Sequence, residues 1–170
     1  MSQPNFIRVI SSSTTGALGT LPRNIVAVSR ETISGFTPDP NSGLVSINAA
    51  QVADFNTANP TKYGFLKFLQ TAFAGNVQPS VVYLLSTGGV ALTSAMLDSA
   101  NYSPRSWSFL NVLSQTNGLD DEATFLADCL TAATWTTAAK KKVFFFAFTA
   151  EPDEYGDITL PAQLLLGGTL

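Results

Sequence analysis

Acidic side chains gather just beyond the last long strand-like run of the chain. That run, Val143–Thr149, predicts a strand buried on both faces. Three carboxylates follow it directly: Glu151, Asp153 and Glu154. Ligands of open α/β sheets bind beyond the carboxyl ends of the strands, so these carboxylates, with Asp120–Asp121, could hold Mg²⁺ or Ca²⁺. No ligand spacing supports such a site, and the nearby proline and glycine are typical of an exposed turn. The pattern therefore favours the rim of a structural domain.

Other features that could carry chemistry have simpler structural explanations. "STGGV", Ser86–Val90, follows an apolar run as phosphate-binding loops do, but it lacks the Lys-Ser/Thr of a P-loop and predicts a tight βα turn. The acids of Asn117–Glu122 are favoured at the start of a helix by its dipole. Ser11–Ser13 have no histidine to activate a hydroxyl, and Cys129 lies on an apolar helix face, as buried structural thiols do. We therefore expect a protein that is not an enzyme and has no catalytic, cofactor-binding or metal-binding residues.

The composition narrows the possible partners. The 170 residues include no histidine and one cysteine, so the commonest general base and the usual ligands of zinc sites are scarce. A net charge of −3 argues against nucleic acid, which attracts basic patches, and Lys140–Lys142 is typical of a solvated helix end. No apolar stretch reaches the ~18 residues that span a bilayer, so we expect no membrane partner. Charged residues make up only 12%, which indicates a surface largely covered by other subunits.

The first twenty residues predict an arm rather than part of a core. Phe6–Ile10 ("FIRVI") reads as a short strand, and Ser11–Thr20 ("SSSTTGALGT") is small, polar and rich in flexible residues. We expect residues 1–20 to form an N-terminal arm with a flexible hinge at Gly16 and Gly19. Residues 21–170 are then expected to form a single α/β domain, either whole or incomplete at its C-terminal end.

Strands and helices alternate through that domain. The apolar patterns predict strands at 24–29, 44–47, 79–86, 107–113 and 143–149. Helices are predicted between them, in 48–55, 60–74, 92–100 and from 120 onward. This order predicts an α/β fold, with a mixed, largely parallel sheet flanked by helices and an extended N-terminal strand arm. Val81–Leu85, Phe109–Leu113 and Val143–Phe148 are expected to be neighbouring parallel strands.

Two helices carry more detailed expectations. Asn59 is expected to cap a helix whose first residue is Pro60. The helix after Asp120–Asp121 is expected to turn one apolar face inward. That face would consist of Phe125, Leu126, Cys129, Leu130 and Ala133.

The order of these segments resembles a known family. "VSINAAQVADFNTANPTKYGFLKFLQTAF", "QPSVVYLLS", "WSFLNVLS", "DDEATFLADCL" and "KKKVFFFAF" follow one another as in the N-terminal half of contractile bacteriophage tail sheath proteins. The likeness covers roughly Leu44–Thr149 and rests on pattern rather than on an invariant signature. Sheath proteins are usually much longer, and the closing run "DITLPAQLLLGGTL" is typical of a domain that is cut or that pairs with another chain.

The resemblance implies a structural role in a virion tail, with assembly in the host cytoplasm. It implies a homo-oligomer of rings or a helical tube, with tail tube and baseplate proteins as further partners. The inter-subunit strand would consist of Phe6, Ile7, Arg8, Val9 and Ile10, added to a neighbour's sheet edge. Three alternatives stay open: this strand pairs within its own domain, the protein is another tail part (tube, terminator or baseplate), or it is a small α/β enzyme or metal-binding domain.

Overall fold

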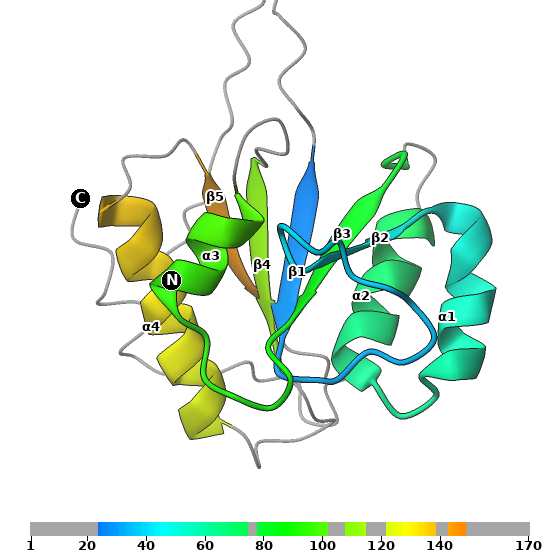
Figure 1. Cartoon of the computed structure of the whole chain (residues 1–170), viewed down its shortest axis with the longest axis horizontal. Helices are drawn as coiled ribbons and strands as arrows, with labels where there is room; N and C mark the ends of the chain where they lie inside the picture. The colour runs from blue at the N-terminus through cyan, green and yellow to red at the C-terminus, as the bar shows by residue number, and fades with distance from the viewer. Residues whose placement is uncertain (1–23, 75–77, 102–107, 115–121, 139–142, 149–170) are drawn as a thin grey trace, which may run out of the picture.

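A five-stranded sheet with helices on both faces forms the domain (Figure 1). The computed structural model describes residues 24–74, 78–101, 108–114, 122–138 and 143–148. The strands are β1 (Ile25–Ser29), β2 (Leu44–Ile47), β3 (Val82–Ser86), β4 (Phe109–Leu113) and β5 (Phe144–Phe148). The helices are η1 (Ala49–Gln51), α1 (Val52–Ala58), α2 (Tyr63–Ala74), α3 (Ser94–Ala100) and α4 (Glu122–Ala138). The predicted α/β class, with a mixed and largely parallel sheet, is confirmed.

The strands lie in the order β2-β3-β1-β4-β5. Four of them are parallel, and only the edge strand β2 runs antiparallel to its neighbour β3. The three strands expected to be parallel are parallel and lie in one sheet, but the prediction that they are neighbours is wrong for β3 and β4. β1 lies between them and pairs with both, and its Val26, Ala27 and Val28 are almost completely buried at the centre of the sheet.

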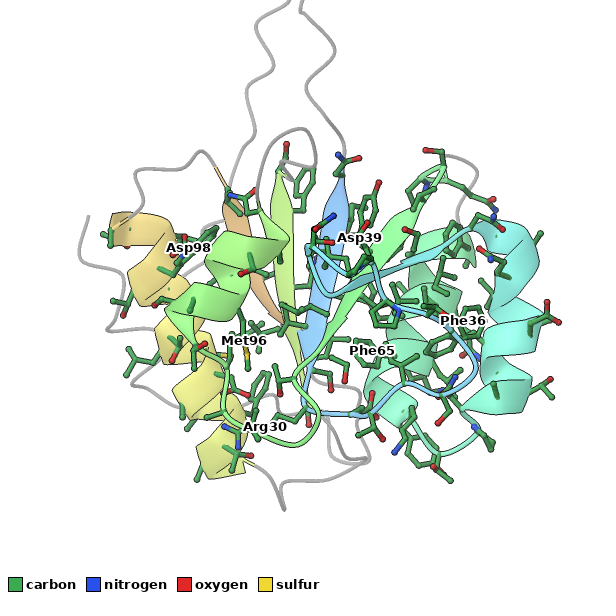
Figure 2. All side chains as sticks on the ribbon, viewed as in Figure 1. Arg30, Phe36, Asp39, Phe65, Met96 and Asp98 are labelled. Atoms are coloured by element: carbon green, nitrogen blue, oxygen red, sulfur yellow. The ribbon has the colours of Figure 1, made fainter. Side chains whose placement is uncertain are left out.

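Two apolar layers fill the spaces between the sheet and its helices. Alternate β1 side chains divide between them, because successive strand residues point to opposite faces: Val26 and Val28 face α3 and α4, whereas Ala27 faces α1 and α2. Figure 2 shows Phe36 and Phe65 on the α1–α2 side and Met96 on the α3–α4 side. The same sheet thus supports two separate cores.

Asn59 does not start a helix, so that prediction is wrong. It follows the last residue of α1, and its side chain accepts from the Ser34 N–H (2.8 Å) and donates to the carbonyls of Ser34 and Phe55. These bonds use the amide to hold the loop after β1. The next helix, α2, begins only at Tyr63, and a different side chain binds its first turn.

The inward face of α4 is rotated from the predicted one. Phe125 and Cys129 are buried as expected, but Leu130 is 68% exposed, so its inward placement is wrong. The buried face continues instead through Asp128, Ala132 and Trp135. Asp128 forms an ion pair with Arg30, and the Trp135 Nε1–H donates to Asp98 Oδ1 (2.9 Å), so two polar contacts fix the rotation of the helix.

Several predicted features lie outside the described residues. They are the arm of residues 1–20 with its strand Phe6–Ile10 and its hinge glycines Gly16 and Gly19, the run Lys140–Lys142, and the acids Asp120, Asp121, Glu151, Asp153 and Glu154.

Candidate functional site

The carboxyl ends of the parallel strands are the natural place for a site in this fold. After β1 the chain forms β2 and β3 on one side of it and then crosses to β4 and β5 on the other side, so the strand order reverses at β1. Ligands of open α/β sheets bind at such a switch point. Arg30 and Glu31 follow β1 there, and the turn Thr87–Val90 follows β3. We refer to Arg30, Glu31 and this turn as the strand-end site.

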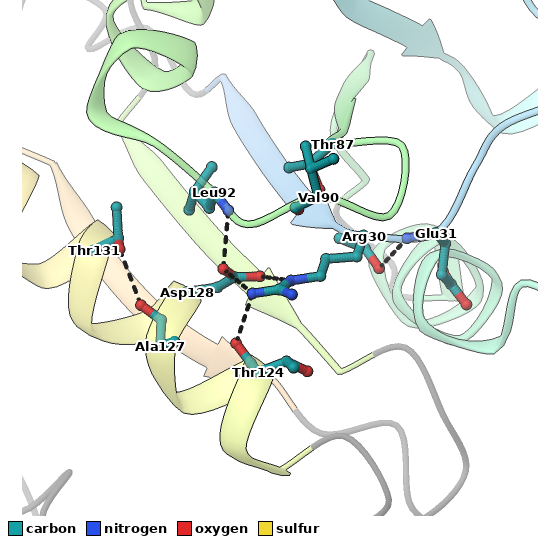
Figure 3. Close-up of polar contacts among 10 residues, drawn as sticks. Arg30, Glu31, Thr87, Val90, Leu92, Thr124, Ala127, Asp128 and Thr131 are labelled. Carbon is teal, nitrogen blue, oxygen red and sulfur yellow. Dashed lines mark hydrogen bonds and ion pairs between the residues drawn. The ribbon is translucent and has the colours of Figure 1, made fainter.

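Arg30 holds the helix layer on one face of the sheet. Its Nε donates to Asp128 Oδ2 at 2.7 Å and its Nη2 to Asp128 Oδ1 at 2.8 Å, a two-pronged ion pair with α4 (Figure 3). Nη2 also donates to the Thr124 carbonyl (3.3 Å), and Asp128 Oδ1 accepts the Leu92 N–H at 3.0 Å. Because the Arg30 and Asp128 side chains are only 13% and 8% exposed, water screens this pair weakly.

Glu31 holds the layer on the opposite face. Its carboxylate accepts the N–H of Gly64 (3.1 Å) and of Phe65 (2.9 Å), two donors in the first turn of α2 that have no partner within the helix. Glu31 thus replaces the missing Asn59 cap from a distant part of the chain. A Cβ atom on Gly64 would collide with the Ser114 carbonyl oxygen, so only glycine fits there.

The surroundings of Glu31 change its acidity. Burial raises the pKa of the carboxyl from 4.5 to about 7, although the two N–H groups, Lys62 and the Ser29 hydroxyl each lower it. Only 6% of the Glu31 residue is exposed, and its removal from water outweighs the bonds that favour the charged form. Glu31 therefore exchanges its proton near neutral pH.

The glycine turn after β3 uses its N–H groups within the chain. The Thr87 N–H donates to the Ser29 carbonyl (3.0 Å), the Gly88 N–H to Ser86 Oγ (3.2 Å) and the Gly89 N–H to the Arg30 carbonyl (2.8 Å). Gly88 and Gly89 have φ values of 65° and 87°, which only glycine adopts readily. A phosphate cradle needs such N–H groups to point at a ligand, whereas these point at β1 and at the turn itself.

The strand-end site therefore joins the sheet to the helices on both of its faces. Two successive residues, Arg30 and Glu31, bind α4 on one face and α2 on the other, and the turn after β3 bonds to both strand ends. We call this arrangement the double clamp. In the part of the chain that the structure describes, every buried polar side-chain atom has a hydrogen-bond partner, and no three potential metal ligands lie together.

A buried thiol and a surface hollow are two further features of the described residues. Cys129 is buried, and burial, with the neighbouring Asp128, raises the pKa of its thiol to about 12, so it stays a protonated apolar side chain. A hollow of about 430 Å³ lies beside β2, where Phe36, Asp39 and Ser46 line it. Asp39 accepts from the N–H groups of Asn41 and Ser42, so its carboxylate shapes the turn before β2.

The residues of the double clamp were missed by sequence reasoning. A signal existed, because Arg30 and Glu31 form a charged pair directly after an apolar strand in a chain with few charges. Asp128 gave a second signal as the one charged residue between Ala123 and Ala138. Neither signal indicates which residues bind to each other, because Arg30 and Asp128 are 98 residues apart in the sequence and Glu31 and Gly64 are 33 apart.

Comparisons of the chain with protein-family models, with curated proteins and with solved structures give no match. Among the described residues, none of the helices has the length and apolar character needed to cross a bilayer.

Proposed function

We propose that the protein is a structural subunit of a contractile phage tail, the sheath that polymerises around the tube and contracts to drive injection. The likeness of Leu44–Thr149 to tail sheath proteins supports this role, and one feature of the structure supports assembly through the sheet. That feature is the open edge of β5.

Among the described residues, β5 is an edge strand that carries none of the usual protection. In the described residues it pairs with β4 alone, and its sequence, Phe144–Phe148, contains no charge and no proline. Proteins that stay monomeric commonly protect such edges with charges, prolines or bulges, because a free row of N–H and C=O groups can bind another strand. At the opposite edge, the Leu44 carbonyl of β2 already accepts the Asp39 N–H (2.9 Å). An added strand is therefore expected at β5.

The N-terminal arm supplies a suitable strand. Apart from Arg8, Phe6–Ile10 is apolar and includes three β-branched residues, so it matches the aromatic edge of β5. The ten residues of Ser11–Thr20 reach on the order of 30 Å when extended, enough to cross to an adjacent subunit. Each added backbone hydrogen bond contributes about 1 kcal/mol, and repetition along a polymer makes the link strong.

The double clamp suits a domain that moves as one body. A contracting sheath has to change the contacts between subunits while each domain keeps its shape. Arg30 and Glu31 tie both helix layers to the same strand end, so force applied to one layer reaches the other through β1.

Electron microscopy of the purified full chain tests the proposal. We expect rings or tubes, and we expect deletion of Met1–Ser12 to leave a folded monomer with an unchanged circular dichroism spectrum. Deletion of Met1–Asn5 is the matched control, because it shortens the arm but keeps Phe6–Ile10, and it should still assemble.

Other outcomes separate the alternatives. Single rings that never stack would favour a terminator or baseplate part, whereas tubes that survive loss of the arm would favour a tail-tube protein. A full chain that stays monomeric at high concentration would contradict the proposal and favour a small α/β enzyme or metal-binding domain.

A further inference from the structure

The outward side of α4 carries no charge after its first residue. The helix lies at the outside of the domain (Figure 1), and the single charged residue between Ala123 and Ala138 is Asp128, which is buried. The exposed residues of this part of the helix are Ala123, Ala127, Leu130, Thr134, Thr137 and Ala138. We call them the outer face of α4.

The other α-helices of the described residues differ from α4 in this respect. Each of them exposes a charged residue: Asp54 on α1, Lys67 on α2 and Asp98 on α3. A helix at the surface of a domain normally directs charged residues at solvent, and a helix without them is normally covered. The outer face of α4 therefore has the composition of a helix that lies against another protein surface.

Threonine hydroxyls of α4 are bonded within the helix itself. Thr131 Oγ1 donates to the Ala127 carbonyl and Thr137 Oγ1 to the Ala133 carbonyl, both at 3.0 Å. Covering these side chains would leave their hydroxyls hydrogen-bonded, so it would not incur the cost of burying an unsatisfied polar group.

The outer face is arranged symmetrically about one leucine. Its positions 123, 127, 130, 134 and 137 recur at steps of four, three, four and three, the spacing of contact residues in paired helices. Leu130 is 68% exposed and is the largest of them. It stands at the middle of α4 (Glu122–Ala138), eight residues from either end, and only alanine and threonine flank it on this face.

We infer that the outer face of α4 binds the same face of a second copy of this chain, with the two helices antiparallel about a two-fold axis at Leu130. Such an axis places Ala123 of one copy beside Thr137 of the other, and Ala127 beside Thr134, so that the same surface serves both copies. A second copy is the partner that the charges favour. An uncharged face offers no counter-charge to a charged surface, and among the described helices only α4 has a matching uncharged face.

The size of this contact determines how it is tested. A helix of 17 residues is about 25 Å long and about 10 Å wide, so its footprint is on the order of 250 Å², against about 800 Å² per partner in a standard interface. We therefore expect a weak pair that has to be trapped covalently. The contact uses neither the arm nor the edge of β5, so it does not depend on the proposed tail function.

Disulfide trapping in the full chain tests the inference. The variants are Leu130→Cys, Ala123→Cys and Thr137→Cys, all at exposed positions, and the native Cys129 is buried and can stay. Helix axes 8–10 Å apart would put the two Leu130 Cα atoms on the order of 5 Å apart, within the range of a disulfide. Thr71→Cys, exposed on α2, is the matched control for random collision.

On mild oxidation we expect disulfide-linked dimers from Leu130→Cys, and from a mixture of the Ala123→Cys and Thr137→Cys proteins. Neither protein of the mixture should form them alone, because antiparallel pairing places the two copies of residue 123 about 20 Å apart. Adding Leu130→Lys to both proteins of the mixture puts like charges together at the axis and should slow trapping about ten-fold or more.

Two results would overturn the inference. Ala123→Cys alone forming dimers as fast as the mixture would indicate parallel helices, and Leu130→Cys reacting no faster than Thr71→Cys would show that α4 is not a contact between copies. Trapping in a chain that forms no rings or tubes would support this contact and contradict the tail proposal, so the two can fail separately.

Discussion

Arg30 and Glu31 are adjacent in the chain, yet they hold opposite faces of the sheet by different physics. Arg30 meets a full opposite charge, and both prongs of its guanidinium bind the Asp128 carboxylate of α4. Glu31 has the N–H groups of Gly64 and Phe65, with the Ser29 hydroxyl and the charge of Lys62 as smaller contributions. The α4 layer is therefore held by a charge pair, and the α2 layer by a carboxylate bound mainly to backbone dipoles.

Because the two halves of the double clamp are held differently, they respond differently to mutation and to pH. An arginine keeps its charge at every pH at which proteins fold, so its half depends chiefly on both partners being present. The pKa of Glu31 is raised to about 7, so its half changes with proton concentration near neutrality. One half is thus sensitive to mutation of its partner, and the other is sensitive to pH.

Removing Asp128 is expected to have the largest effect. Asp128→Ala leaves the Arg30 charge buried without its carboxylate and takes away the acceptor of the Leu92 N–H. Breaking one side of a buried ion pair costs about 3–5 kcal/mol of folding free energy. Urea unfolding followed by circular dichroism measures the loss.

Asp54→Ala is the matched control for this change, because Asp54 is an exposed acid on α1. It should change stability by less than about 0.5 kcal/mol. A loss of under about 1 kcal/mol for Asp128→Ala would mean that the ion pair does not secure α4.

Glu31 is expected to make the domain less stable as pH rises. Its pKa is about 7 in the folded protein and 4.5 in the unfolded chain, so between these values only the folded state keeps the proton. Stability therefore falls as pH rises from 4.5 to 7, by about 3 kcal/mol for this group, and levels off above. Below 4.5 both states are protonated, and the contribution is fully present.

Glu31→Gln isolates that contribution from the other acids, because glutamine has nearly the same shape and does not titrate. The difference in unfolding free energy between the wild-type protein and Glu31→Gln should shift by about 3 kcal/mol against the wild type between pH 5 and pH 8. Parallel pH profiles for the two proteins would show that the acidity of Glu31 is not raised.

Sequence patterns predicted the fold because its determinants are local. Runs such as Val81–Leu85 and Val143–Phe148 are apolar throughout, which marks strands buried on both faces, and the helices between them require parallel pairing. The position of β1 between β3 and β4 was not predicted, since strand order depends on which side each crossover takes. The hydrophobic periodicity of the sequence does not indicate which side a crossover takes.

The double clamp was not predictable in the same way. Arg30 pairs with a residue on α4 and Glu31 with backbone groups of α2, and no local pattern records either contact. Long-range bonds also account for the two local errors. The Asn59 amide binds Ser34 instead of capping a helix, and the burial of Asp128 turns Leu130 outward although hydrophobicity alone predicts it inside.

The smallest expected effect is at Leu130, and it tests whether the clamp sets the rotation of α4. With 68% of the residue exposed, Leu130→Lys should change the free energy of unfolding by less than about 0.5 kcal/mol. Phe125→Ala on the same helix is the contrasting change, because Phe125 is 8% exposed and its loss should cost about 3–5 kcal/mol. Urea titration of both variants gives the comparison. A loss above about 2 kcal/mol for Leu130→Lys would place that side chain inside, as its hydrophobicity predicts, and would require a helix whose rotation is set by apolar packing and not by the Arg30–Asp128 pair.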